Sequence, residues 1–228
     1  LHKARVRLIA NGGGLVYAPL GPTHLAIEDI AILRAIPGMC ILAPCDAQEM
    51  RRLMLQTVDW PGPIYIRVAK GGDPVVSRPD LPCDIGKAIM VRDGRDALVV
   101  TTGVTLQEAL AAAQQLERAG LAVGVLHLHT IKPFDRPAVL SAVAKAPIVV
   151  TVEEHTLNGG LGSAVAELIA EAGFTPAKRF RRLGIPDVFP DKYGSQSDLI
   201  NAFGFGAAGI VNAVEALAAE QPRLSVAG

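Results

Sequence analysis

The stretch GPTHLAIEDIAILRAIPGM, residues 21–39, carries the strongest signal in this 228-residue chain. It places His24 in a Gly-Pro turn, and apolar residues then recur at helical spacing until Pro37, which predicts an amphipathic helix that begins at the histidine. A histidine in a turn can donate a hydrogen bond or carry a proton, so His24 is a candidate catalytic residue facing a small anionic or hydroxylated substrate. The residues alone allow equally that His24 caps its own helix through Thr23.

Short apolar strands and helical patterns alternate around this stretch. Strands are expected at 5–10, 40–43 and 64–68. A second helix is expected after Asp46, where Glu49 completes a capping-box pattern, and it stops at the Pro-Gly-Pro run 61–63. This order of strand and helix predicts a parallel sheet.

The segment 69–84 is rich in Gly and Pro and lacks periodicity, which is typical of a linker. The order of strand and helix then restarts and predicts a second α/β domain. Its strands are expected at 97–101, 122–128, 148–152 and near 178–182, and its helices at 106–119, 136–144, 163–172, 197–202 and 207–219. We therefore divide the chain into a first domain at 1–75, a linker at 76–90 and a second domain at 91–228.

Composition narrows the class of protein. Half of the residues are hydrophobic and 19% are charged, which is typical of a folded α/β protein and excludes a disordered chain. The formal net charge is zero, so neither nucleic acid nor an acidic membrane surface is an expected partner. The basic run 178–182 is expected to be a solvated strand end or a subunit contact rather than a phosphate site. The apolar runs are too short to cross a membrane and no signal peptide is visible, which favours the cytoplasm.

The chain has three cysteines, Cys40, Cys45 and Cys83, without paired spacing. We expect buried free thiols in a reducing compartment rather than disulfides, nucleophiles or zinc ligands. His127 and His129 alternate along a predicted strand and therefore face the same side. A metal pair is conceivable, but the sequence shows no third ligand, so we expect no metal site and prefer a pair on a sheet face near an interface.

Three charged residues near the first stretch are further candidates. Glu28 and Asp29 fall in the first turns of the predicted helix, where stabilisation of the helix dipole is preferred over acid catalysis or metal binding. Arg67 lies in a buried strand near its carboxyl end, where open α/β sheets bind ligands, so it is a candidate for holding a phosphate or carboxylate. The alternative for Arg67 is an ion pair with Asp73 or Glu49.

Two regions in the second half of the chain each allow more than one functional interpretation. Glu153, Glu154 and His155 end a predicted strand and could perform acid–base chemistry or line a subunit interface. The glycine-rich run 159–162 follows a strand and opens a helix, as phosphate-binding turns do, but it lacks the dinucleotide fingerprint and is predicted to be a tight turn. The run 11–14 has no following Lys-Ser/Thr and is not a nucleotide P-loop.

Several ordered motifs together resemble the transketolase family. Residues 21–44 resemble the latter half of the thiamine-diphosphate pyrimidine-binding domain of transketolases and deoxyxylulose-phosphate synthases. Residues 130–135 and 152–163 resemble the C-terminal α/β domain of the same superfamily, which has a mainly parallel sheet. The chain is most similar to split transketolases, in which this half is a separate C-terminal subunit.

The resemblance implies roles for particular residues. The histidine of this turn faces the substrate in the family, which implies a catalytic role for His24. An arginine on the strand after the second helix holds the sugar phosphate, which implies substrate binding by Arg67. It assigns no cofactor-binding residue to this chain. Leu20 stands where transketolases usually carry an aspartate that reads a substrate hydroxyl, so a specialised or less hydroxylated donor is expected.

The implied reaction transfers a two-carbon ketol unit between sugar phosphates with thiamine diphosphate and Mg²⁺. In the family, the glutamate that pairs with the aminopyrimidine lies upstream of the turn, in a part that this sequence does not include, and the diphosphate and magnesium bind to the N-terminal half. We therefore expect a truncated chain or a separate subunit that needs an N-terminal partner, in a homodimer or heterotetramer. The alternatives are the beta subunit of a 2-oxo-acid dehydrogenase and a non-catalytic dimerising module.

Overall fold

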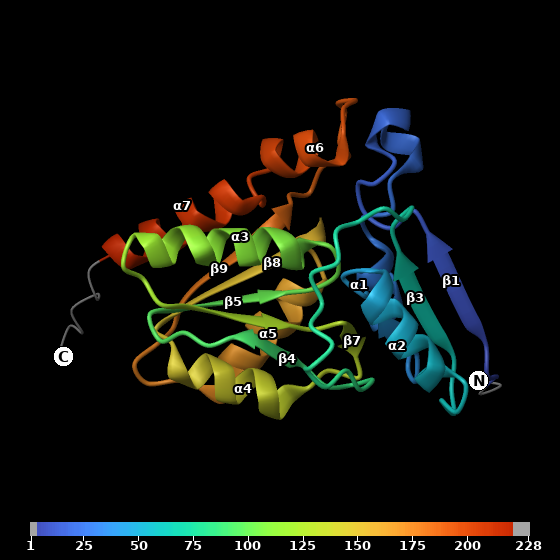
Figure 1. Ribbon diagram of the computed structural model, residues 1–228, viewed down its shortest axis with the longest axis horizontal. Helices are drawn as coiled ribbons and strands as arrows, with labels where there is room; N and C mark the ends of the chain where they lie inside the picture. The colour runs from blue at the N-terminus through green and yellow to red at the C-terminus, as the bar shows by residue number, and fades with distance from the viewer. Residues whose placement is uncertain (1–3, 221–228) are drawn as a thin grey trace.

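The computed structural model describes residues 4–220, which form two sheets flanked by helices (Figure 1). The first sheet has the strand order β1-β3-β2-β7. Its strands are β1 (Arg7–Asn11), β2 (Cys40–Leu42), β3 (Ile64–Val68) and β7 (Thr130–Lys132), and its helical segments are η1 (Ala18–Leu20), η2 (Pro22–His24), α1 (Asp29–Arg34) and α2 (Ala47–Thr57). The strands β1, β3 and β2 run parallel, as predicted, and β7 joins β2 in the antiparallel sense.

The second sheet has the strand order β4-β6-β5-β8-β9. Its strands are β4 (Ile89–Arg92), β5 (Ala97–Thr101), β6 (Val123–His127), β8 (Ile148–Thr156) and β9 (Arg179–Ile185), and its helices are α3 (Thr105–Arg118), α4 (Arg136–Lys145), α5 (Leu161–Ala172), α6 (Gln196–Ala202) and α7 (Ala207–Ala219). Only β4 is antiparallel to its neighbour, so the prediction of a mainly parallel sheet is confirmed.

Helices cover both faces of each sheet. In the second sheet, α3 and α7 lie on one face and α4 and α5 on the other (Figure 1). In the first sheet, Ile41 of β2 packs with Ile30 of α1, while Leu42 and Ile66 pack with Leu53 of α2. Successive strand residues point to opposite faces, so α1 and α2 cover opposite sides of this sheet.

Two strands, β4 and β7, are absent from the sequence-based prediction. The β4 strand begins within the expected linker 76–90. It lies at the edge of the second sheet and forms its backbone hydrogen bonds with β6. The β7 strand has three residues and pairs with β2 of the other sheet, so the second half of the chain completes the first sheet. Such short strands form because a distant partner supplies their hydrogen bonds, which local periodicity does not report.

The stretch Gln196–Ala219 has the length and mean hydropathy, 1.5, of a helix that could cross a membrane. Here it forms two helices, α6 and α7, separated by a turn in which Gly204 has a φ of 73°. In α7, Ile210, Val214 and Leu217 are buried in the core against α3 and β8. The buried apolar residues of this stretch therefore contribute to the core of this fold, and 33% of the apolar window is buried.

Candidate functional site

The turn that carries His24 does not start a helix. Ala26 forms isolated β-bridges with Gly13 and Gly14, so the chain stays extended after the turn and α1 begins only at Asp29. The prediction of a helix that begins at His24 is therefore wrong, because pairing with the loop after β1 overrides the local helical pattern.

His24 is exposed in the short helix η2. Its Nδ1 lies 3.0 Å from the hydroxyl oxygen of Thr23. Within residues 4–220 the other ring nitrogen, Nε2, has no hydrogen-bond partner, so it is open to a ligand. Thr23 thus orients the ring of His24, and this contact does not cap a helix.

Gly21 allows the turn that carries His24 to approach the second half of the chain closely. Its φ of 84° favours glycine, and a Cβ at this position would lie 2.7 Å from the ring of Tyr193. Tyr193 comes just before α6, which packs beside η1 at the upper end of the molecule in Figure 1. The position of the His24 turn therefore depends on both halves of the chain.

Arg67, on β3, is buried where the two halves meet and is only 7% exposed. Its Nε donates to Oδ2 of Asp29 at 2.9 Å. Its Nη2 donates to the carbonyl oxygens of Ala26 and Glu154, each at 2.9 Å. The guanidinium therefore connects α1, the segment after His24 and strand β8.

The ion-pair partner of Arg67 is Asp29, and not Asp73 or Glu49 as the sequence-based alternative proposed. The hydroxyl of Tyr65 donates to the same Asp29 oxygen at 2.7 Å. Burial opposes the ionisation of Asp29, but Arg67 and Tyr65 outweigh it and lower the pKa of this carboxyl. Sequence reasoning did not identify Tyr65, because a tyrosine in an apolar strand is an ordinary core residue.

The residues 153–155 are all buried in β8 and bonded within the chain. Glu154 accepts hydrogen bonds from the backbone N–H of Leu15 at 3.0 Å and from Nε2 of Gln196 at 2.7 Å. Gly14 packs so closely on the Glu154 carboxylate that no Cβ would fit there. Glu154 therefore fastens the loop after β1 and helix α6 to the second sheet.

Glu153 fills the glycine-rich turn before α5. Its carboxylate oxygens accept the backbone N–H groups of Leu161 at 2.6 Å and Gly162 at 2.7 Å. A Cβ on Gly160 would collide with this carboxylate, so the glycine allows the close approach. The prediction of a tight turn is confirmed, and the amides that would bind a phosphate already bind Glu153.

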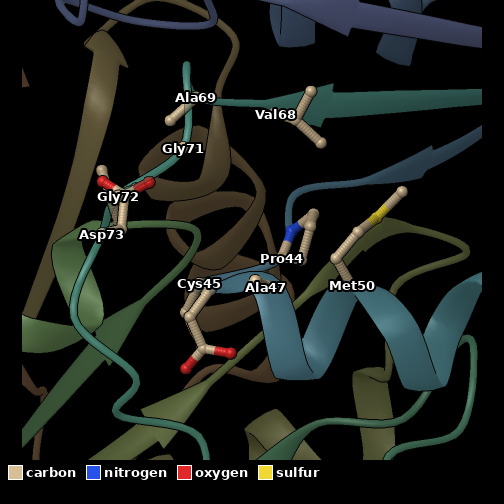
Figure 2. Close-up of a pocket in the computed structure, with 11 residues that line it drawn as sticks. Pro44, Cys45, Ala47, Met50, Val68, Ala69, Gly71, Gly72 and Asp73 are labelled. Carbon is tan, nitrogen blue, oxygen red and sulfur yellow. The ribbon is translucent and has the colours of Figure 1, made fainter.

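A pocket of about 190 Å³ lies between the start of α2 and the segment after β3 (Figure 2). It is lined by Pro44, Cys45, Asp46, Ala47, Met50, Val68, Ala69, Gly71, Gly72, Asp73 and Val104. The charged members of this lining are Asp46 and Asp73, and it includes no lysine or arginine. The amides at the start of α2 donate to Asp46, so this pocket does not suit a strongly anionic group.

His127 ends β6, and His129 lies in the bend before β7, with their ring centroids 6.1 Å apart. His127 Nε2 lies 2.9 Å from Oε2 of Glu49 on α2, and His129 also lies against Glu49. The two histidines share a side, as predicted. The sequence did not predict that both histidines contact Glu49, because Glu49 is about eighty positions away in the chain.

Residues 179–182 of the basic run lie in β9. Arg179 donates to the carbonyl oxygens of Leu217 and Glu220 at the end of α7, and Arg182 donates to that of Leu157. These side chains satisfy backbone carbonyls within the chain, including those at the C-terminus of α7.

Comparison with known proteins agrees with this architecture. Residues 86–210 match the family model of the transketolase C-terminal domain, and residues 1–72 match that of the transketolase pyrimidine-binding domain. A subunit of an apulose-4-phosphate transketolase from Phocaeicola vulgatus is 39% identical over 80% of this chain and 57% of its own length. A subunit of a 6-deoxy-6-sulfo-D-fructose transketolase from Clostridium sp. is 36% identical over 83% of this chain and 61% of its own length.

Among solved structures, a split-gene transketolase described as an inactive beta4 tetramer superimposes with a TM-score of 0.83 and is 33% identical. That match covers 95% of this chain and 67% of the other. The chain spans less than two thirds of the length of the two curated relatives. From its sequence motifs, its two sheets and these matches, the chain belongs to the transketolase family and carries pyrimidine-binding and C-terminal domain sequence.

Proposed function

We propose that this chain is the C-terminal component of a transketolase-type transferase that moves a two-carbon ketol unit between sugar phosphates. The observation that carries this proposal is the exposed His24 turn, held by the loop after β1 on one side and by Tyr193 on the other. Family membership and the named transketolase subunits among its relatives support it.

In this proposal His24 faces the substrate. Thr23 holds Nδ1, which leaves Nε2 to donate a hydrogen bond to the substrate oxygen on which negative charge develops. A well-placed donor of this kind contributes roughly 2–4 kcal/mol to the transition state.

Arg67 is the proposed contact for the substrate phosphate. Within residues 4–220 its Nη1 makes no hydrogen bond, and Arg67 is among the residues that line a small cavity with Gly13 and Gly103. Asp29 fixes the plane of the guanidinium, so only this free nitrogen is available to an incoming anion.

Leu20 is the proposed determinant of the sugar. It is 53% exposed at the end of η1, close in sequence to His24. An apolar side chain cannot hydrogen-bond a sugar hydroxyl, so a donor that lacks a hydroxyl at this point is favoured. Two relatives are named for unusual sugars, a sulfofructose and apulose 4-phosphate, which supports a specialised substrate.

Thiamine diphosphate and Mg²⁺ are the proposed cofactors of the assembled enzyme, and an N-terminal subunit or region is the proposed partner. The pocket at the start of α2 does not fit the diphosphate group, because its lining is acidic and apolar and the helix N-termini at α2 and α5 bind Asp46 and Glu153. The partner would therefore supply the diphosphate and magnesium site. The solved relative described as an inactive tetramer of one kind of chain supports this dependence. We place the assembly in the cytoplasm, in keeping with three free cysteines.

The test is reconstitution with an N-terminal transketolase subunit in the presence of thiamine diphosphate and Mg²⁺. Ketol transfer from a ketose phosphate to an aldose phosphate is expected, and His24→Gln should reduce kcat/KM by roughly 100- to 1000-fold. Arg95→Gln, on an exposed loop residue, is the matched control and should leave kcat/KM unchanged. Turnover of pyruvate with a lipoyl acceptor would instead indicate a 2-oxo-acid dehydrogenase. A complex without any activity would indicate a non-catalytic dimerising module.

A further inference from the structure

A group of metal-ligating side chains lies at the junction of the two halves, away from His24. Two overlapping triads share one carboxylate, and in each triad the ligand atoms lie within 4.8 Å of one another. We call this group the Cys/His cluster, and its members are Cys45, Glu49, Cys83, His127 and His129. They come from the start of α2, the linker, the end of β6 and the bend before β7, so the cluster exists only in the folded chain.

The cluster contains buried polar atoms that nothing satisfies. His127 Nδ1 and His129 Nε2 are buried and lack a hydrogen-bond partner within residues 4–220. Both histidines are almost fully buried, with 1% and 0% exposed. Buried nitrogens are normally bonded, and the unpartnered Nε2 of His129 is a free ligand for a cation. His127 faces the shared carboxylate through Nε2, at 2.9 Å from Glu49.

We propose that the Cys/His cluster binds a divalent cation of the Zn²⁺ class. Thiolate and imidazole ligands select such borderline-soft ions over Mg²⁺ or Ca²⁺. Around a tetrahedral zinc with bonds of about 2.0–2.3 Å, ligand atoms are roughly 3.3–3.8 Å apart. The ligand atoms of each triad lie within 4.8 Å of one another, so the side chains must draw together when the cation binds. Glu49, Cys83 and His129 supply three ligands, and Cys45 or His127 supplies the fourth.

Binding of the cation changes the protonation of the cluster but not its oxidation state. Each thiol that ligates gives its proton to the solvent and a sulfur lone pair to the metal, and no redox partner is needed.

Two cavities border the cluster. Cys45 is among the residues that line the 190 Å³ pocket at the start of α2, and Figure 2 shows it opposite the segment 69–73. On the other side, Glu49 and His127 border a small cavity that Arg52 also lines. Arg52 donates to the carbonyl oxygens of Arg78 and Leu81, which holds its charge at the cavity edge.

The test uses the purified full chain, stripped with a chelator and titrated with Co²⁺ and then Zn²⁺. We expect one ion per chain by elemental analysis, thiolate-to-cobalt charge-transfer absorption, and release of protons on binding. Cys83→Ser should weaken binding by at least about 100-fold, since loss of a ligand exceeds the effect of an outer-shell change. Cys40→Ser is the matched control, because Cys40 is also a buried free thiol but lies outside the cluster, and it should bind like the unmodified chain.

Two results would overturn the proposal. The first is an unmodified chain that takes up no stoichiometric ion and gives no sulfur-to-cobalt absorption, which does not depend on any variant folding. The second is an equal loss of binding in Cys40→Ser and Cys83→Ser, since the effect would then reflect general unfolding. Neither readout involves ketol transfer, so the outcome is independent of the proposed function.

Discussion

At the scale of single residues, the protein places titratable groups in the interior and gives each a specific partner. His155 is fully buried, and both of its ring nitrogens are engaged. Nδ1 donates to the carbonyl oxygen of Thr156 at 2.7 Å, and Nε2 accepts the backbone N–H of Ala31 at 3.3 Å. Only a neutral imidazole can make both bonds.

This geometry makes stability depend on pH. Burial, assisted by the charge of Arg67, lowers the pKa of His155 from 6.5 to about 4. Between these values the unfolded chain binds a proton that the folded chain excludes, so the contribution of His155 to stability falls as the pH drops from 6.5 to about 4. The contribution of this group is about 3 kcal/mol across the window.

The measurement is urea unfolding of the metal-free chain at a series of pH values. His155→Gln should flatten the slope in this window, while His24→Gln, at an exposed position, should keep it. Two other buried groups set the slope that remains in both variants: His129, whose pKa burial lowers to about 4, and Glu153, whose pKa burial raises to about 7 and which acts in the opposite direction. An unchanged slope in His155→Gln would contradict the assignment.

At the scale of elements, helix α2 depends on one carboxylate. Asp46 Oδ1 accepts the backbone N–H groups of Gln48 and Glu49, each at 2.9 Å, as an N-cap does. The predicted capping box is only half formed, because the Glu49 side chain accepts the N–H of Cys45 instead of that of Asp46. The second Asp46 oxygen accepts the N–H groups of Val76 and Ser77 in the linker.

Asp46 therefore both starts a helix and fastens the linker. Asp46→Ala should destabilise the chain by roughly 3–5 kcal/mol, because it removes a cap and several charge-assisted hydrogen bonds. Ser195→Ala, which removes the exposed N-cap of α6, is the control and should cost only about 1 kcal/mol. Chemical denaturation measures both, and equal losses would mean that the linker contacts contribute nothing.

At the scale of the whole molecule, shared core residues and hydrogen bonds join the two sheets. Strand β7 pairs with β2 across the boundary, and Nζ of Lys132 donates to the carbonyl oxygens of Arg34 and Ile36. Arg67 binds Glu154 of β8 in the same way. These contacts should make the two sheets unfold together.

Arg67→Met should uncouple the sheets, since it leaves the Asp29 carboxylate buried without its cation at a cost of about 3–5 kcal/mol. The single tryptophan, Trp60, lies between α2 and β3 and reports on the first sheet. Its fluorescence transition should coincide with that of far-UV circular dichroism in the unmodified chain and precede it in the variant. Arg136→Met removes an exposed pair with Glu171 and should leave the transitions coincident, and coincidence in Arg67→Met would refute the coupling.

The local sequence pattern was sufficient to predict the elements that have a clear hydrophobic periodicity of their own. The strand 64–68 and the helix 207–219 match their predicted bounds, because continuous apolar runs and helical spacing are properties of neighbouring residues. The Glu153 turn and the buried free thiols were likewise predictable from residue type and spacing. The family resemblance depended on the same local motifs.

The sequence by itself thus determined the α/β class, the parallel sheets and the exposed turn that carries His24. Only the tertiary structure decided where α1 begins, that β7 completes the first sheet, that Arg67 pairs with Asp29, and that two cysteines meet Glu49 and two histidines. The physical reason is that each of these depends on partners distant in sequence. Hydrogen bonds and ion pairs form wherever packing brings the groups together, and one chain's local pattern does not encode which distant groups meet.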